Sequence, residues 1–232
     1  MKLQAFAAPL ALGLVMISFG LAQSAQAYEA GDWVVRAGAT YVDPDDSSSV
    51  VRLNQDSLGE DSGVSVGGDT QLGLTLGYMF NSHWGVELLA STPFEHDLDA
   101  EGEALAGLNI NEVGKADQLP PTLSAIYYFD STRRFKPYLG LGVNYTGFFD
   151  EDLSGEVTDA LGDASLSLDD SWGLAAQLGA DFELTERLHL NFSVRYFDLQ
   201  TDAEIKLSDG SRINVDVDVD PLVYTLGLGF RF

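Results

Sequence analysis

Apolar residues recur at every second position over long stretches of this chain. In residues 72–80 the even positions are Leu72, Leu74, Leu76, Tyr78 and Phe80, and the odd positions are Gly, Thr or Met. The same alternation returns in seven further stretches: 33–42, 84–93, 119–129, 136–148, 172–184, 188–196 and 222–232. Successive side chains of a strand point to opposite faces, so a period of two indicates β-strands. The sequence therefore predicts an all-β protein with eight strands.

Apolar and polar residues also alternate along the strands of a soluble β-sandwich, in which the apolar face is turned inward. Three features favour a transmembrane barrel instead. The strands are about ten residues long, whereas soluble strands average about 5–6. Their connections alternate between short (81–83, 130–135, 185–186) and long (43–68, 94–118, 149–168, 200–216). Aromatic residues gather near both ends of the apolar face, as in a wall that faces lipid. We therefore expect an eight-stranded antiparallel transmembrane β-barrel whose apolar face points outward.

Charge separates the long connections from the rest of the chain. The stretches 43–69, 94–118, 149–170 and 198–220 hold 29 of the 36 acidic residues, and the formal net charge is −24. In such barrels the long loops are extracellular and the short turns periplasmic. The expected architecture therefore has four long acidic extracellular loops and three short periplasmic turns. An acidic chain without a basic cluster also argues against a nucleic-acid partner.

The first 27 residues have the pattern of a secretory signal peptide. Lys2 gives a basic start, residues 5–22 are largely apolar, and Ala25-Gln26-Ala27 is a small-x-small cleavage pattern. A membrane anchor is the alternative, but no basic stop-transfer flank follows. We expect cleavage after Ala27, leaving the barrel as residues 28–232.

Several motifs then resemble those of OmpW-type outer-membrane proteins. They are HWGVELLASTPF at 83–94, LPPTL at 119–123, PYLGLGVNYT at 137–146 and DSWG at 170–173. The aromatic terminus Phe232 resembles the signal that bacterial barrel-assembly machinery reads. The resemblance covers the whole expected mature chain. It implies a Gram-negative outer-membrane barrel with a narrow apolar interior that admits small hydrophobic molecules; the alkane-uptake barrels belong to the same broad family.

Strand parity selects the residues expected inside the barrel. An eight-stranded barrel is barely wider than its own inward side chains, which excludes a large hydrated pore. The candidates for lining a channel are Leu89, Phe148, Arg195 and Phe197. The candidates for a buried charge network nearer the turns are Arg36, Glu87, Asp181, Glu183 and Arg231. We expect an apolar funnel at the loop end, closed below by this network, because buried charges need partners.

Three prolines suggest where a ligand could leave. Pro93 ends the third strand, and Pro120 and Pro121 open the fourth. Proline has no backbone N–H, so this strand pair loses ladder bonds at its loop end. A lateral exit into the membrane is one interpretation, and simple strand termination is the other.

Chemistry of other kinds has little support. His189, Ser193 and Asp181 could be suggested as a hydrolytic set, but residues four apart on one strand are about 13 Å apart. We therefore expect no enzymatic activity and no cofactor. Asp216, Asp218 and Asp220 are weak metal candidates, more typical of an acidic rim near lipopolysaccharide. The expected partners are outer-membrane lipids and lipopolysaccharide, the assembly machinery and a small hydrophobic ligand. The alternative function is a sealed structural or receptor barrel that acts through its acidic loops.

Overall fold

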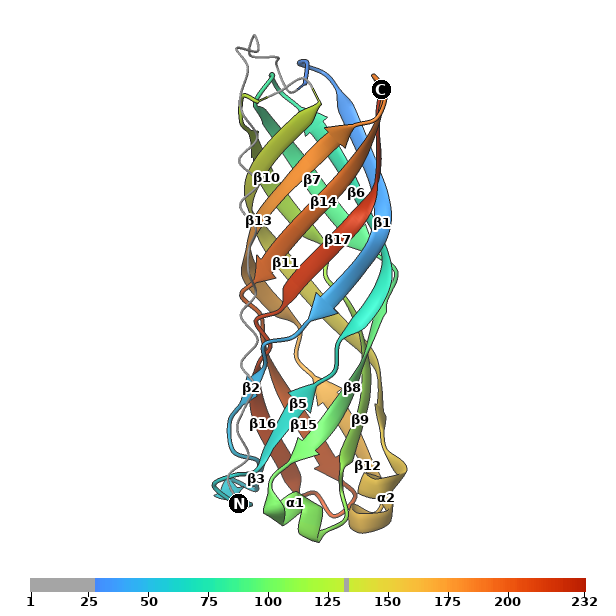
Figure 1. The fold of residues 1–232 in the computed structure, drawn as a ribbon. Coiled ribbons are helices and arrows are strands. Elements are labelled where there is room, and N and C mark those ends of the chain that lie inside the picture. The colour runs from blue at the N-terminus through green and yellow to red at the C-terminus, as the bar shows by residue number, and fades with distance from the viewer. Residues whose placement is uncertain (1–27, 132–133) are drawn as a thin grey trace, which may run out of the picture.

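The computed structural model describes residues 28–131 and 134–232, and the expected signal peptide lies outside them. The chain forms an elongated antiparallel β-barrel (Figure 1). Its wall consists of β1 (Trp33–Asp43), β6 (Asp69–Met79), β7 (Trp84–Ser91), β10 (Thr122–Tyr128), β11 (Phe135–Leu153), β13 (Ser171–Glu183), β14 (Leu188–Phe197) and β17 (Leu222–Arg231). Each predicted strand is present, which confirms the eight-stranded antiparallel barrel.

Two pairings show that the wall is closed. The strands follow one another in the order β10-β7-β6-β1-β17-β14-β13-β11, and β10 also pairs with β11. The first and last strands meet in register, with Ala39 opposite Leu226 and Tyr41 opposite Tyr224. Each of the eight described wall strands therefore pairs with a neighbour on both sides, which is the condition for a sheet that spans a membrane.

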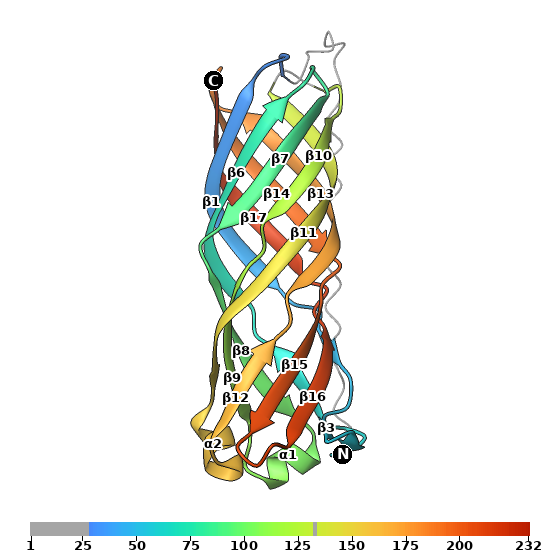
Figure 2. The same ribbon diagram turned by 180° about the vertical axis from the view of Figure 1, so that it is seen from behind.

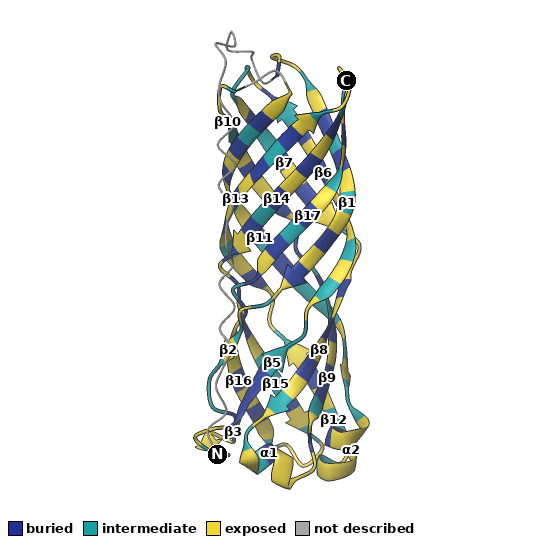
Figure 3. Cartoon of the chain, in the orientation of Figure 1, coloured by how far each residue is buried: buried dark blue, intermediate teal, exposed yellow. Residues whose placement is uncertain are grey.

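The alternation in the sequence becomes an alternation between lumen and exterior. Figure 3 shows buried and exposed residues in turn along each wall strand. The outward residues are apolar: Leu72, Leu74 and Leu76 are 49%, 44% and 42% exposed. An aromatic band at the turn end contains Trp33, Phe80, Trp84, Phe129, Phe182 and Phe230. At the other end of the apolar face, Tyr41, Trp172 and Tyr196 are exposed. The apolar face points outward, as predicted.

The short turns are held by side chains that accept backbone hydrogen bonds. Asn81 Oδ1 accepts from the backbone N–H groups of His83 and Trp84, both at 2.9 Å. Thr185 Oγ1 accepts from the N–H of Leu188 at 3.0 Å. Polar side chains thereby satisfy donors that the turn would otherwise leave unpaired.

Gly38 and Gly227 face each other where β1 meets β17. A Cβ at Gly38 would lie 2.3 Å from Leu226 O, and one at Gly227 would lie 2.4 Å from Ala37 O. Only glycine therefore fits at either position while the two strands keep this separation.

The long connections fold into strands and short helices beyond the loop end of the barrel wall. We call this part the extension (residues 44–68, 92–121, 147–170 and 198–221). One side is built from β5 (Gly63–Val66), β8 (Phe94–Glu101), β9 (Glu112–Leu119) and the end of β11. The other side is built from β12 (Ala164–Leu168), β15 (Gln200–Leu207), β16 (Arg212–Asp218), β2 (Ser47–Ser48), β3 (Arg52–Leu53) and β4 (Asp56–Ser57). The sequence analysis predicted long loops here, and the structure has strands instead. These strands form because apolar residues alternate with acidic ones in these stretches.

Two short helices cover the far end of the extension. They are α1 (Glu103–Gly107) and α2 (Gly155–Leu161), and both lie at the opposite end of the molecule from the C-terminus (Figures 1 and 2). Ser154 caps α2, since its side chain accepts from the N–H of Val157. Among the described residues, no helix has the length and apolar character needed to cross a bilayer.

Candidate functional site

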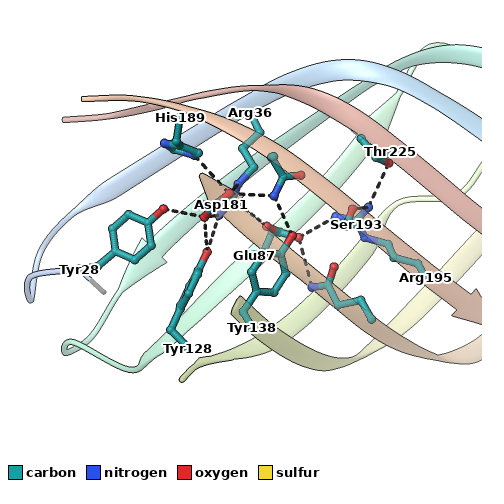
Figure 4. Close-up of polar contacts among 12 residues, drawn as sticks. Tyr28, Arg36, Glu87, Tyr128, Tyr138, Asp181, His189, Ser193, Arg195 and Thr225 are labelled. Carbon is teal, nitrogen blue, oxygen red and sulfur yellow. Dashed lines mark hydrogen bonds and ion pairs between the residues drawn. The ribbon is translucent and has the colours of Figure 1, made fainter. Parts of the chain in front are cut away.

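An ion-paired cluster fills the lumen in the half of the barrel nearer the turns. Arg36 of β1 lies at its centre. Its Nη1 donates to Glu87 Oε2 at 2.6 Å, and its Nη2 and Nε donate to the two oxygens of Asp181 at 2.8 and 3.1 Å. The three residues come from β1, β7 and β13 and are at most 5% exposed. Their side chains therefore cross the lumen and join opposite walls of the barrel (Figure 4).

A second arginine completes the charge balance of this cluster. Arg195 Nη2 donates to Glu87 Oε1 at 3.0 Å, and Gln177 Nε2 donates to the same oxygen at 3.3 Å. Arg195 Nη1 also donates to Ser193 and Thr225. Two guanidinium groups thus face two carboxylates, so the cluster of Arg36, Glu87, Asp181 and Arg195, here called the floor, carries no net charge. This balance matters because an unpaired charge at this depth would be strongly unfavourable.

Aromatic hydroxyls close the floor on the side of the turns. Tyr28 is 1% exposed, and its hydroxyl donates to Asp181 Oδ2 at 2.6 Å. Tyr128 contacts both Arg36 and Asp181, and its ring lies 4.8 Å from that of Tyr28. The ammonium of Lys136 lies 4.4 Å from the centre of the Tyr28 ring. The first described residue of the chain is therefore part of the closure.

Two predicted members of the charge network lie elsewhere. Glu183 pairs with Lys136 at 3.2 Å, and Arg231 pairs with Asp32 at 3.4 Å. Each is the last residue of its strand, at the rim where water reaches the side chains. Strand parity correctly predicted that these side chains face the lumen side of the wall. It could not predict their position along the barrel axis. Glu183 and Arg231 are not part of the floor.

An apolar constriction lies directly above the floor. Leu89 and Phe197 are 5% and 2% exposed and belong to one apolar cluster with Phe94, Ala175 and Val223. Leu89 also lines a small cavity of about 10 Å³ together with Arg36. The predicted lining residues Leu89 and Phe197 are thus buried in the apolar interior, and Arg195, also predicted to line a channel, is paired within the floor.

Two neighbouring apolar cavities lie above this constriction, inside the extension. The inner cavity, of about 30 Å³, is lined by Phe148 among other residues, and by the polar side chains of His96, Gln118 and Thr201. The outer cavity, of about 50 Å³, lies under α1 and α2 and is lined by Val51, Leu58, Val64, Leu98, Leu105, Ile110, Val113, Val157, Leu161, Leu166, Ala203, Ile205, Ile213 and Val215. Both cavities include Val64, Leu98 and Ala203 in their walls, so they are adjacent. The apolar part of the interior therefore belongs to the extension.

Charged side chains on the extension support the walls of these cavities from outside. Glu156 accepts from the backbone N–H groups of Asn111 and Glu112 at 2.6 and 3.1 Å, and these bonds lower the pKa of its carboxyl. Lys115 bridges Glu95 and Asp97 across β8 and β9, which raises the pKa of its ammonium. All these pairs are exposed, so each contributes little stability by itself.

The strand ladder is interrupted beside the prolines. Pairing of β7 with β10 ends at Leu89 opposite Thr122, and pairing of β8 with β9 begins at Phe94 opposite Gln118. In the described chain, no backbone pair joins 90–93 to 119–121. The buried side chain of Asn144 donates to Pro120 O at 3.3 Å and to Thr122 Oγ1 at 3.0 Å. The Thr122 hydroxyl donates to the same Pro120 oxygen at 3.1 Å, so two side chains satisfy a carbonyl that lies outside the ladder. Pro93 and Pro121 are exposed and Pro120 is buried.

The weaker candidates are not assembled into sites. Asp216 and Asp218 alternate with buried valines on β16, so they lie on the outer face of the extension. Asp220 accepts from the N–H of Leu199. Across the described ranges, no group of three or more His, Cys, Asp or Glu side chains could hold a metal ion. His189 lies 3.5 Å from Asp181, but Ser193 is bonded to Arg195. The suggested hydrolytic set is therefore not formed.

Sequence reasoning missed several residues that the structure brings together. Tyr28 lies before the first strand, so strand parity could not assign it to the lumen. The polar face of the inner cavity was also missed, although Phe94, His96 and Leu98 alternate with acidic residues just as wall strands alternate. That pattern was present in the sequence and would have identified β8 as a strand.

Comparison with known proteins agrees with this architecture. The model of the OmpW family matches residues 29–232. Outer membrane protein W of Vibrio cholerae is 42% identical over 207 residues, covering 89% of this chain and 91% of that protein. The dibenzothiophene metabolism operon protein PahQ of Pseudomonas aeruginosa is 29% identical over 205 residues, covering 88% and 90%.

A solved structure agrees closely in three dimensions. The crystal structure of outer membrane protein OprG from Pseudomonas aeruginosa superposes with a TM-score of 0.81 at 46% identity, covering 89% of this chain and 98% of that one. Barrels of this family are not enzymes. A closed wall with a lipid-facing exterior, the match over residues 29–232 and these relatives lead to one conclusion: this chain belongs to the OmpW family of Gram-negative outer-membrane β-barrels.

Proposed function

We propose that this barrel admits small hydrophobic molecules through its extension and releases them sideways into the membrane. The observation that carries the proposal is the position of the two apolar cavities. They lie above a floor that closes the lumen and beside an interruption of the strand ladder. A molecule in these cavities has no apolar route downward, because Arg36, Glu87, Asp181 and Arg195 cross the lumen.

The orientation in the membrane follows from the same reasoning. The extension faces outward from the cell, and the three short turns face the periplasm. Its acidic surface then meets the lipopolysaccharide layer, Phe232 serves the assembly machinery, and cleavage after Ala27 leaves residues 28–232 as the mature barrel. Support for an apolar cargo comes from PahQ, whose name refers to dibenzothiophene, an apolar aromatic compound.

The exit is assigned to the gap between residues 90–93 and 119–121. Continuing the β7–β10 register places Ser91 opposite Pro120. The chain has no cysteine, so a Ser91→Cys/Pro120→Cys pair would be the only thiols present. Oxidation would join the strands across the gap, and reduction would separate them again within the same protein.

The test measures uptake of a small apolar fluorophore by cells that lack the protein, express it, or express this double variant. The matched control is Thr40→Cys/Thr225→Cys, which links β1 to β17 where the two hydroxyl oxygens are 3.1 Å apart. We expect oxidation to slow uptake through the first pair and reduction to restore it, with no change for the control. Uptake that is equally fast with the gap closed would contradict lateral release.

The closed floor also favours a second candidate, a sealed barrel that acts as a receptor or structural protein through its acidic extension. This alternative predicts that cells with and without the protein take up the fluorophore at the same rate. A Leu89→Arg variant, which adds a charge at the constriction, would then also have no effect.

A further inference from the structure

The two cavities of the extension differ in polarity. The side chains that line the outer cavity are all Val, Leu, Ile or Ala. The inner cavity adds three polar side chains, His96, Gln118 and Thr201, which are only 5%, 4% and 5% exposed. Burying a polar group is unfavourable unless it finds a hydrogen-bond partner. The way these three groups are bonded therefore indicates what the inner cavity can recognise.

The bonds of His96 fix its protonation. His96 Nδ1 lies 2.6 Å from the carbonyl oxygen of Gly67, which can only accept, so Nδ1 carries the hydrogen. In a neutral ring Nε2 is then an acceptor, and it receives the amide N–H of Gln118 at 2.6 Å. Burial is the largest influence on His96 and lowers its pKa, which keeps the ring neutral at pH 7.

These bonds leave two acceptors unused at the cavity. The hydrogen bond of Gln118 employs its amide nitrogen, so Oε1 of the same group has no partner among the described residues. Thr201 Oγ1 donates its hydrogen to Asp169 O at 2.7 Å and retains its lone pairs. The N–H of His96 and the hydroxyl hydrogen of Thr201 are therefore occupied on the protein, and Gln118 uses one of its two amide N–H groups on His96. The inner cavity still offers two acceptors and the second amide N–H of Gln118, a combination that suits a hydroxyl group, which both donates and accepts.

The charges around the inner cavity restrict the ligand further. Asp69, Asp97 and Asp117 are the carboxylates whose fields act on His96. Glu95 adds a fourth negative charge nearby, and Lys115, which pairs with Glu95 and Asp97, is the neighbouring cation. An anionic ligand would meet net repulsion here, because four carboxylates face the single ammonium of Lys115.

We propose that the inner cavity binds the hydroxyl end of a small apolar alcohol, which donates to Gln118 Oε1, while its hydrocarbon part lies in the outer cavity. Thr201 Oγ1 is the second acceptor within the same wall. This inference rests on the proposed function, since it requires that small apolar molecules enter the extension. It narrows that class to molecules that can donate a hydrogen bond. A ketone only accepts, so it can use the second amide N–H of Gln118 but leaves both acceptors without a partner. Carboxylates are repelled, and hydrocarbons bind without using the polar face.

The test uses the full barrel in lipid nanodiscs and four probes of equal chain length: 1-hexanol, hexane, 2-hexanone and hexanoate. Binding is followed by NMR of methyl-labelled Leu and Val side chains, which line both cavities. Partition of each probe into lipid is the same for every variant, so variants are compared probe by probe. Gln118→Leu removes the acceptor and nearly preserves the shape. Gln200→Leu, on the exposed face of β15, is the matched control.

We expect Gln118→Leu to lower the affinity for 1-hexanol about tenfold. This is the scale of one neutral hydrogen bond whose loss leaves a hydroxyl unpaired. The affinity for hexane should change less than about twofold. The Gln200→Leu control should change the affinity for neither probe. Thr201→Val, which keeps the bond between Gln118 and His96, should weaken 1-hexanol by a smaller factor and leave hexane unchanged. It provides an independent measurement if Gln118→Leu disturbs folding.

The possible failures are distinguishable. If the wild-type barrel binds both probes but Gln118→Leu and Thr201→Val affect them equally, or affect neither, the preference for alcohols is wrong and the proposed function stands. If hexanoate or 2-hexanone binds as tightly as 1-hexanol, the assignment of acceptors is wrong. If neither hexane nor 1-hexanol binds the wild-type barrel, both the inference and the proposed function are overturned.

Discussion

Removing the charge of Glu87 should destabilise the barrel more than any single change on its surface. Glu87 is 3% exposed and accepts from Arg36 at 2.6 Å and from Arg195 at 3.0 Å. In Glu87→Gln the side chain keeps its size but loses its charge. Arg36 retains Asp181, whereas Arg195 retains only the hydroxyls of Ser193 and Thr225. One positive charge is then left unbalanced in the lumen.

The loss of stability follows from the energy of the ion pair and, separately, from the energy of its hydrogen bonds. Removing one partner of a buried ion pair costs about 3–5 kcal/mol. Charge-assisted hydrogen bonds contribute about 1.5–3 kcal/mol each, and Glu87 accepts two of them from arginines. We therefore expect the free energy of unfolding to fall by about 3–5 kcal/mol, a large part of the total stability of a domain.

The assay is equilibrium unfolding in urea with the barrel in lipid vesicles, followed by tryptophan fluorescence and by the mobility of folded and unfolded barrel on gels. The double variant Glu87→Gln/Arg195→Met restores neutrality. We expect it to be more stable than the sum of the two single variants predicts, because the two residues are in direct contact. A loss below about 1 kcal/mol in Glu87→Gln, or strict additivity in the double variant, would refute the role assigned to the floor.

Three further outcomes are expected. Gly38→Val should prevent closure of β1 against β17, because its Cβ would lie 2.3 Å from Leu226 O; loss of the heat-resistant folded band on a gel measures this, and Gly107→Val, which has open space around it, should fold normally. Leu98→Ala, in the wall of both cavities, should cost about 2–5 kcal/mol in urea unfolding and leave assembly intact. Burial lowers the pKa of His96 below its ordinary value of 6.5, so the unfolded chain binds more protons and stability should decrease as pH falls from 6.5 through the lowered folded pKa. Carbon-detected NMR of the ring and urea midpoints between pH 7 and 4 test this, and a midpoint shift that persists in His96→Gln would assign the effect to another group.

The wall of the barrel could be predicted from the sequence because lipid and lumen impose a period of two on every strand. Predicted stretches such as 33–42 and 188–196 agree with β1 and β14 within one residue. The largest difference is at the end of β11, which runs to Leu153 rather than to 148 because its last residues pair with β9 in the extension. The third strand stops at Ser91 and the fourth begins at Thr122, inside the predicted stretches 84–93 and 119–129. Proline explains both, since it cannot donate to the ladder. The extension was predicted as loops because acidic residues on its outward face resemble a solvated loop.

What the sequence determined alone is the direction in which each wall side chain points, because parity along a strand is a local property. It placed Arg36, Glu87, Asp181 and Leu89 inside the barrel without any knowledge of their neighbours. Only the tertiary structure decided which of them meet, since contacts across the lumen depend on the height that each strand reaches after register and tilt are set. That height separates Glu183 and Arg231 at the rim from the floor. It also places Tyr28 beneath Asp181 and brings His96 and Gln118 together at the inner cavity. These are long-range consequences of barrel closure, and no local pattern in the chain contains them.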